Sequence, residues 1–143
     1  MVAAGPLALT VAALFTGAAF YVNFAEQHAR LQLDDRAALT QWKPSYHRGF
    51  IMQASLAVIG FLFGVAAWLQ DGNAWWLIGA ATLLANWPFT LVAIMPKNKQ
   101  LGDTAPEAAG PQSRALMEQW GQLHGVRTLL GAISTAIFLW LLV

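Results

Sequence analysis

Four long apolar runs constrain this chain more than any other feature of its sequence. They cover about residues 5–25, 49–69, 74–95 and 126–143. Each run approaches or exceeds the ~20 residues that cross a bilayer core as a helix rising 1.5 Å per residue. Four spans and their connections occupy all 143 residues, so the sequence predicts an all-α integral membrane four-helix bundle in a single domain, 1–143. We expect its transmembrane helices at about 5–27, 45–69, 74–96 and 116–143.

The composition agrees with a membrane protein and excludes several classes of function. Charged residues make up 10% of the chain, against roughly 25% in a typical soluble domain. The lipid bilayer is therefore the expected environment, and the absence of a basic run argues against a nucleic-acid partner. The absence of cysteine excludes disulfides, thiolate metal sites and iron–sulfur clusters. The first apolar run has no basic segment before it, so we interpret it as a retained helix rather than a signal peptide.

The positive charges lie in two of the three connections between the runs. Every Lys and Arg except Arg127 lies in the first connection, about 26–48, or the third, about 96–125, whereas the short turn 70–73 has none. The positive-inside rule places the two basic connections in the cytoplasm. The sequence therefore predicts a multi-pass membrane protein with both the N- and C-termini on the non-cytoplasmic side.

Two prolines predict local breaks in the helices. Residues 34–42 are typical of a short interfacial helix, which we expect to end at Pro44, where the second transmembrane helix opens. Pro88 should kink the third helix because it lacks a backbone N–H. The neighbouring Asn86 is placed to satisfy the freed backbone groups.

Small residues recur at a spacing that favours close helix packing. Gly60 and Gly64 in the second helix form a small-xxx-small pattern, and Gly121 and Gly125 repeat it in the last helix. We interpret the pattern as packing within the bundle. A homodimer contact is the alternative that the pattern leaves open.

Most of the remaining polar side chains are expected near the cytoplasmic ends of the helices. Asn23, Glu26 and Arg30 stand at i, i+3 and i+7, and share a face of the first helix. Because these helix ends converge, we expect Glu26, His47, Asn98, His124 and Arg127 to line one cavity. The candidate substrate-binding residues are Trp120, Glu26, Asn23, His47, Thr90 and Asn86.

Alternative interpretations of these residues stay open at this point. Glu26 and Arg127 are also compatible with a structural ion pair between helices, and His28 with an exposed helix end. His47, His124 and Glu26 are sufficient in number for a metal or haem site. The sequence lacks a local spacing such as H-x-x-x-H, so we predict no metal site, and the cofactor remains unknown or absent.

Three segments carry a resemblance to a known family. The last helix contains Trp120-Gly-Gln-Leu-His124-Gly-Val-Arg127-Thr128, which resembles a W-x-x-L-H-x-x-R-T motif. Residues 88–101 are similar to a P-x-T…P-x-N-x-x-L segment, and the Trp42…Ser45…Arg48 pattern is similar as well. Together these motifs resemble the anthrone-oxygenase-like family of small four-helix membrane proteins.

The resemblance implies oxygenation of an anthrone to a quinone without a classical organic cofactor. It singles out Thr90, Asn98, Trp120, His124 and Arg127. In that reading His124 removes a proton, while Arg127 and Asn98 stabilise the oxyanion, so His124, Arg127 and Asn98 are the candidate catalytic residues.

Three hypotheses about function therefore remain. The first is an oxygenase or oxidoreductase that acts on a lipophilic anthrone- or quinone-type small molecule in a cytoplasmic-side polar pocket. The second is a module that binds metal, haem or quinone through His and Glu. The third is a non-catalytic accessory protein or small transporter subunit.

Overall fold

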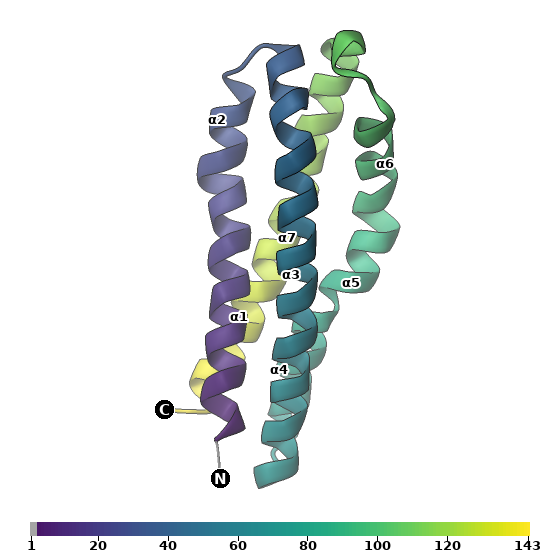
Figure 1. The fold of residues 1–143 in the computed structure, drawn as a ribbon. Coiled ribbons are helices and arrows are strands. Elements are labelled where there is room, and N and C mark those ends of the chain that lie inside the picture. Colours follow the sequence, from purple (N-terminus) through teal and green to yellow (C-terminus); the bar gives the residue numbers. More distant parts are fainter. Residues whose placement is uncertain (1–2) are drawn as a thin grey trace.

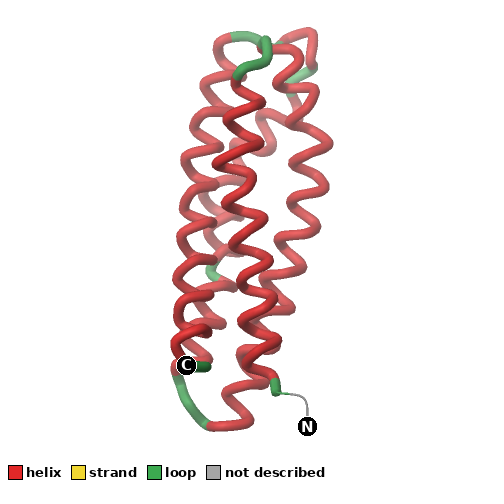
Figure 2. Tube along the Cα trace, turned by 90° about the vertical axis from the view of Figure 1, so that its left-hand side faces the viewer, coloured by secondary structure: helices red, strands yellow, loops and turns green. Residues whose placement is uncertain are grey.

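The computed structural model describes residues 3–143 as a bundle of four long helical segments (Figure 1). Helix follows helix along nearly the whole trace, and the described residues contain no strand (Figure 2). All four segments are long and apolar enough to cross a membrane, which confirms the predicted four-helix, multi-pass membrane protein. The segments are Ala4–Leu31, Asp35–Asp71, Trp75–Asp103 and Pro111–Trp140.

The second and fourth segments are single helices, whereas the first and third are interrupted. The single helices are α3 (Asp35–Asp71) and α7 (Pro111–Trp140), with the short η3 (Pro106–Ala108) in the connection before α7. The first segment consists of α1 (Ala4–Tyr21), the π-helical turn η1 (Val22–Glu26) and α2 (Gln27–Leu31). The third consists of α4 (Trp75–Leu84), α5 (Asn86–Phe89), the π-helical turn η2 (Thr90–Ile94) and α6 (Met95–Asp103).

The two ends of the bundle differ in charge. The chain starts and finishes at the lower end in Figure 1, whereas α2 and α6 run to the upper end. We call the upper end, where the basic residues of 26–48 and 96–125 flank the connections 32–34 and 104–110, the basic end, and the lower one the terminal end. The structure thus places the two basic connections together and both termini opposite them. That the basic end faces the cytoplasm remains a prediction.

Glycines allow the helices to pack closely near the terminal end. A Cβ atom added at Gly60 would lie 2.5 Å from Leu83 Cδ2, and one added at Gly64 would lie 2.7 Å from Ala80 Cβ. These positions belong to the interface of α3 with α4, and a Cβ atom at Gly121 would lie 2.9 Å from Gln27 Nε2. The interpretation as packing within the bundle is therefore confirmed for Gly60, Gly64 and Gly121, whereas Gly125 has no neighbouring atom within 4 Å of an added Cβ. The same apolar core contains the fully buried Phe15 of α1.

The predicted helix break at Pro44 is wrong. The helix α3 begins after Asp34, whose side chain accepts a hydrogen bond from Ala37 N at 2.8 Å, and it runs through Pro44 without ending. A proline inside a helix costs about 3 kcal/mol through one lost hydrogen bond and a steric clash. The turns before Pro44 are nevertheless kept in line, because Leu39 and Trp42 are fully buried in a second apolar cluster at the basic end.

The predicted irregularity at Pro88 is confirmed. The helix α4 ends at Leu84, and Asn86 Nδ2 donates a hydrogen bond of 2.9 Å to the Leu83 carbonyl. Above this break α5 and α6 swing away from α3 (Figure 1). The bend separates the third segment from α3 at the level where polar side chains enter the bundle.

Candidate functional site

A small, partly open cavity, here called the site cavity, lies between η1, α3, α6 and α7. It has a free volume of about 30 Å³, which is enough for ordered water. Its lining includes the polar side chains of Tyr46, Gln53, Asn98, His124 and Arg127, together with Trp120 and the apolar Phe50 and Ile94. The structure thus brings together all three candidate catalytic residues and one of the candidate binding residues, Trp120.

The helix α7 presents one stripe of side chains to this cavity. Trp120, His124 and Arg127 stand at i, i+4 and i+7, and they expose only 5%, 4% and 7% of their surface. The rings of Trp120 and His124 are inclined at 35° with their centroids 5.1 Å apart. The predicted stripe therefore faces the bundle interior rather than the lipid.

The hydrogen bonds of Asn23 define the tautomer of His124. Asn23 Nδ2 donates to the Gly121 carbonyl at 2.7 Å, so its Oδ1 is the acceptor atom. This Oδ1 lies 2.8 Å from His124 Nδ1 and also accepts from Thr128 Oγ1 at 3.0 Å. His124 Nδ1 must therefore carry the proton, because an acceptor faces it. In a neutral imidazole Nε2 is then the free acceptor, and no described residue forms a hydrogen bond with it.

Arg127 is a buried cation without a matching anion. Its Nη1 donates to Thr90 Oγ1 at 3.1 Å, and its guanidinium carbon lies 5.7 Å from the ring centroid of Phe15. Its Nε has no hydrogen-bond partner, and no carboxylate of the described residues forms an ion pair with it. An uncompensated buried charge is costly in a protein interior and in a membrane. This arrangement suits a site that receives negative charge from a ligand.

Two further amides leave polar atoms unpaired at the cavity. Asn98 Oδ1 accepts a hydrogen bond of 2.8 Å from Trp120 Nε1, whereas its buried Nδ2 lies near the Tyr46 hydroxyl but forms no hydrogen bond within 3.5 Å. The Oε1 of Gln53 is also buried without a partner. Buried polar groups are normally satisfied, so these atoms are available to bind a polar ligand or ordered water.

A second hollow, here called the lateral hollow, adjoins the site cavity between α3 and α5. It has a free volume of about 40 Å³ and shares Phe50, Gln53 and Arg127 with the site cavity. The candidate binding residues Asn86 and Thr90 line it. Both predicted residues therefore lie next to the site cavity rather than in its wall.

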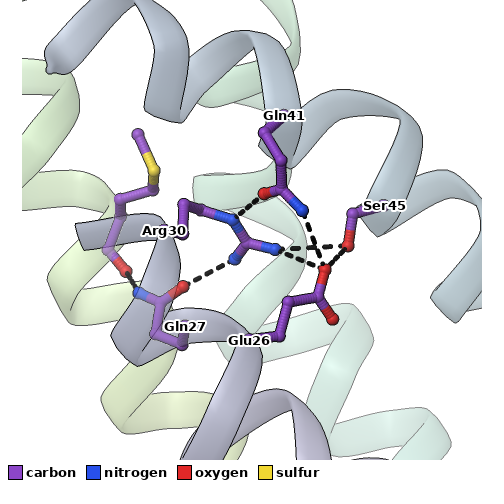
Figure 3. A network of polar contacts seen from close by, with 6 residues as sticks. Glu26, Gln27, Arg30, Gln41 and Ser45 are labelled. Atoms are coloured by element: carbon purple, nitrogen blue, oxygen red, sulfur yellow. Dashed lines mark hydrogen bonds and ion pairs between the residues drawn. The ribbon is translucent and has the colours of Figure 1, made fainter. Parts of the chain in front are cut away.

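Glu26 lies outside both hollows, in a polar network with Arg30 (Figure 3). Arg30 donates to Glu26 at 2.9 Å, to Gln27 at 2.6 Å and to Ser45 at 3.2 Å, and it also bonds to Gln41. The structural pair of Glu26 with Arg127 is therefore not formed. Glu26 reaches the cavity only indirectly, through its hydrogen bond with the lining residue Ser45.

The π-helical turn η1 explains why Glu26 and Asn23 separate. The expectation that they share a face assumes a regular α-helix, but Val22–Glu26 is wound more widely. Such a turn changes the direction of the side chains that follow it. Asn23 consequently faces α7, whereas Glu26 faces α3. The other π-helical turn, η2, begins at Thr90, so both turns lie beside the site.

His47 does not belong to the site. Its side chain is exposed, while Tyr46 lines the cavity and stacks on Trp42 with ring centroids 4.7 Å apart. Adjacent residues of a helix point in directions about 100° apart, so only one of the pair can face inward. His28 is exposed as expected. Among residues 3–143 no three His, Cys, Asp or Glu side chains gather around a common point, so the alternative metal site is not assembled.

Sequence reasoning missed Tyr46, Phe50 and Gln53 as cavity residues. The sequence did contain a usable signal. The helix face that carries the buried Gly60 and Gly64 can be followed toward the start of α3 at spacings of three and four residues. This stripe passes through Ala57, Gln53, Gly49, Tyr46 and Trp42. Extending the glycine pattern by a heptad repeat would have identified Tyr46 rather than His47.

Comparison with known proteins gives one family match. A family model described as anthrone oxygenase matches residues 42–137, which is most of the chain. No curated protein and no solved structure matches the chain. The matched residues include the cavity walls from α3, α6 and α7 but not Asn23, which orients His124.

Proposed function

Because the chain belongs to the anthrone oxygenase family, we propose that it is a membrane-embedded oxygenase which converts a lipophilic anthrone-type aromatic to a quinone. The observation that carries this proposal is the buried Arg127, which has no carboxylate partner and shares a cavity with the oriented imidazole of His124. A base next to an unpaired cation is suited to making and stabilising an organic anion.

The first step is the removal of a proton from the substrate. An anthrone has a CH2 group opposite its ketone, and loss of one proton spreads the negative charge over the ring system and the ketone oxygen. His124 Nε2 accepts this proton, because Nδ1 donates to Asn23. Arg127 and the free amide N–H of Asn98 then stabilise the oxyanion.

The second step is the reaction of this anion with O2. The electron-rich anion reduces O2 and binds it at the former CH2 carbon, which gives a hydroperoxide after protonation by the imidazolium of His124. Loss of the second hydrogen from that carbon and cleavage of the O–O bond release water and leave a ketone. One CH2 group and one O2 thus yield one C=O and one H2O, so no external reductant is needed.

The aromatic walls of the site cavity suit a flat substrate. Trp120 and Tyr46 both line it, and Trp120 packs edge-on against Trp42 with centroids 5.9 Å apart. The site cavity and the lateral hollow are each large enough only for ordered water, so the substrate must displace Phe50 and Gln53 between them. With the basic end in the cytoplasm, this pocket lies in the cytoplasmic half of the membrane.

The proposal is tested with purified protein in lipid nanodiscs supplied with anthrone and air. We expect O2 uptake and quinone formation in a ratio of one to one, with one ¹⁸O atom from ¹⁸O2 in each quinone. His124→Gln should lower the rate by about 10²- to 10⁴-fold, the range for loss of a general base. The exposed histidines provide matched controls, since His28→Gln and His47→Gln should retain the full rate. A His124→Gln protein that is folded and fully active contradicts the proposal.

A further inference from the structure

Packed apolar clusters flank the site cavity toward both ends of the bundle. On the side of the basic end it meets an apolar cluster in which Leu39, Leu101 and Met117 are fully buried. On the side of the terminal end lie Ala57 and Leu83, which are also fully buried. A molecule moving along the bundle axis would have to disrupt a packed layer in either direction.

A series of hollows instead leads sideways from the cavity to the bundle surface. The site cavity and the lateral hollow share Phe50, Gln53 and Arg127. A surface groove on α3, here called the outer groove, then shares Ala54 and Trp87 with the lateral hollow. The three hollows are thus neighbours, separated by these shared side chains, and they form a series from the outside of α3 to His124.

The mouth of this path is apolar and lies in a membrane-spanning part of the chain. It is bordered by Ile51, Ile59 and Trp87, which expose 53%, 42% and 42% of their surface, and Leu91 beside it exposes 56%. Exposed apolar side chains in a span face lipid. The mouth therefore selects molecules that are already dissolved in the bilayer.

One hydrogen bond crosses this mouth. The indole Nε1 of Trp87 on α5 donates to the Ala54 carbonyl of α3 at 3.2 Å. Below this level α4 packs against α3, whereas above it α5 and α6 diverge from α3 (Figure 1). Movement of the Trp87 side chain would open the mouth into the lateral hollow, and displacement of Phe50 and Gln53 would then open the way into the site cavity.

We infer that the apolar aromatic substrate enters the site from the bilayer, between α3 and α5, past Trp87 and Ala54. The identity of the entering molecule rests on the proposed function, but the route rests on the hollows alone. The polar groups then lie in order along the path, since Asn86 and Gln53 precede His124.

The route is tested by thiol labelling, because the chain has no cysteine. Gln53→Cys places one thiol where the lateral hollow meets the site cavity. In nanodiscs we expect N-pyrenylmaleimide, a flat lipid-soluble reagent, to label this thiol, whereas a sulfonated methanethiosulfonate in the aqueous phase reacts at least tenfold more slowly. The pyrenylmaleimide rate is normalised to that of Val92→Cys, whose side chain is 79% exposed within the membrane-spanning third segment. The rate of the sulfonated reagent is normalised to that of Asp103→Cys, an exposed position at the end of α6.

Two second-site changes distinguish the lateral route from others. Ala54→Phe fills the wall shared by the outer groove and the lateral hollow, and should slow pyrenylmaleimide labelling at least tenfold. Ala13→Phe, at an exposed alanine of α1, is the matched control and should leave the rate unchanged. Trp87→Ala should accelerate labelling severalfold, and it decides the question if Ala54→Phe does not fold.

Faster labelling by the sulfonated reagent, or no response to either Ala54→Phe or Trp87→Ala, overturns the lateral route. None of these readouts requires turnover. A protein that passes the labelling tests but fails to oxidise anthrone therefore refutes only the proposed function.

Discussion

Asn23 is the residue whose replacement tests the geometry of the site most sharply. It connects η1 to α7 by three hydrogen bonds, with Gly121, His124 and Thr128. Asn23→Leu keeps the size of the side chain and removes all three. Such bonds contribute about 1 kcal/mol each in soluble proteins and about 0.6 kcal/mol in membrane proteins. The free energy of unfolding should therefore fall by about 2 to 3 kcal/mol.

The same change should affect turnover through the imidazole. Without Asn23 Oδ1, no fixed acceptor keeps the proton on Nδ1 of His124. The loss of a preference of about 1 kcal/mol lets the other tautomer compete, and 1.4 kcal/mol corresponds to a tenfold change in rate. We expect kcat for anthrone to fall by up to about 5-fold with little change in KM, since Asn23 does not line the cavity.

The assay is unfolding by sodium dodecyl sulfate in mixed micelles, followed by tryptophan fluorescence, together with steady-state O2 uptake. Thr128→Val is the matched control, because it removes only one of the three hydrogen bonds and leaves the contact of Asn23 with His124 in place. It should cost about one third as much stability and leave kcat unchanged. Equal effects of Asn23→Leu and Thr128→Val on both quantities would refute the assignment of Asn23 as the residue that orients His124.

Three further predictions follow from the packing and the charges. Arg127→Met should leave the free energy of unfolding unchanged or raise it, because an unpaired buried charge is removed. Anthrone turnover should fall about 10²- to 10³-fold. A large loss of stability in a denaturant titration would instead assign Arg127 to the structural core. Gly79→Ala should destabilise by about 1 to 3 kcal/mol in the same titration, since its Cβ would lie 2.5 Å from Phe138 Cε1. Gly125→Ala has no atom within 4 Å of the new Cβ and should stabilise by up to about 1 kcal/mol; the reverse order would refute the packing. In intact cells an impermeant thiol reagent should label Asn73→Cys but not Thr104→Cys, and the opposite pattern would invert the predicted orientation.

The bundle could be predicted from the sequence because its determinants are local and strong. An apolar run of 20 residues has few alternatives to a transmembrane helix. The basic residues in two of the connections predicted which helix ends lie together, and Pro88 predicted the break between α4 and α5. The continuity of α3 through Pro44 could not be predicted, since it depends on the burial of Leu39 and Trp42 against helices that are distant in sequence.

The candidate site was predictable where its residues lie on a regular helix. Trp120, His124 and Arg127 share a face of α7 because the helix is unbroken there. Glu26 was misplaced because η1 winds more widely than an α-helix. No local residue pattern predicts such a π-helical turn. His47 was misplaced because a polar residue at a helix end was assumed to face inward, whereas the neighbouring aromatic Tyr46 does so.

The central claim is that His124 and Arg127 generate and hold an organic anion, and anaerobic absorption spectroscopy tests it most directly. Without O2 the reaction should stop at the deprotonated anthrone, whose extended conjugation shifts its absorption to longer wavelength. The account predicts that wild-type protein in nanodiscs produces this spectrum with anthrone, that His124→Gln does not, and that admitting air converts the anion to quinone. An unshifted spectrum of neutral anthrone in wild-type protein that nevertheless turns over in air would contradict the account.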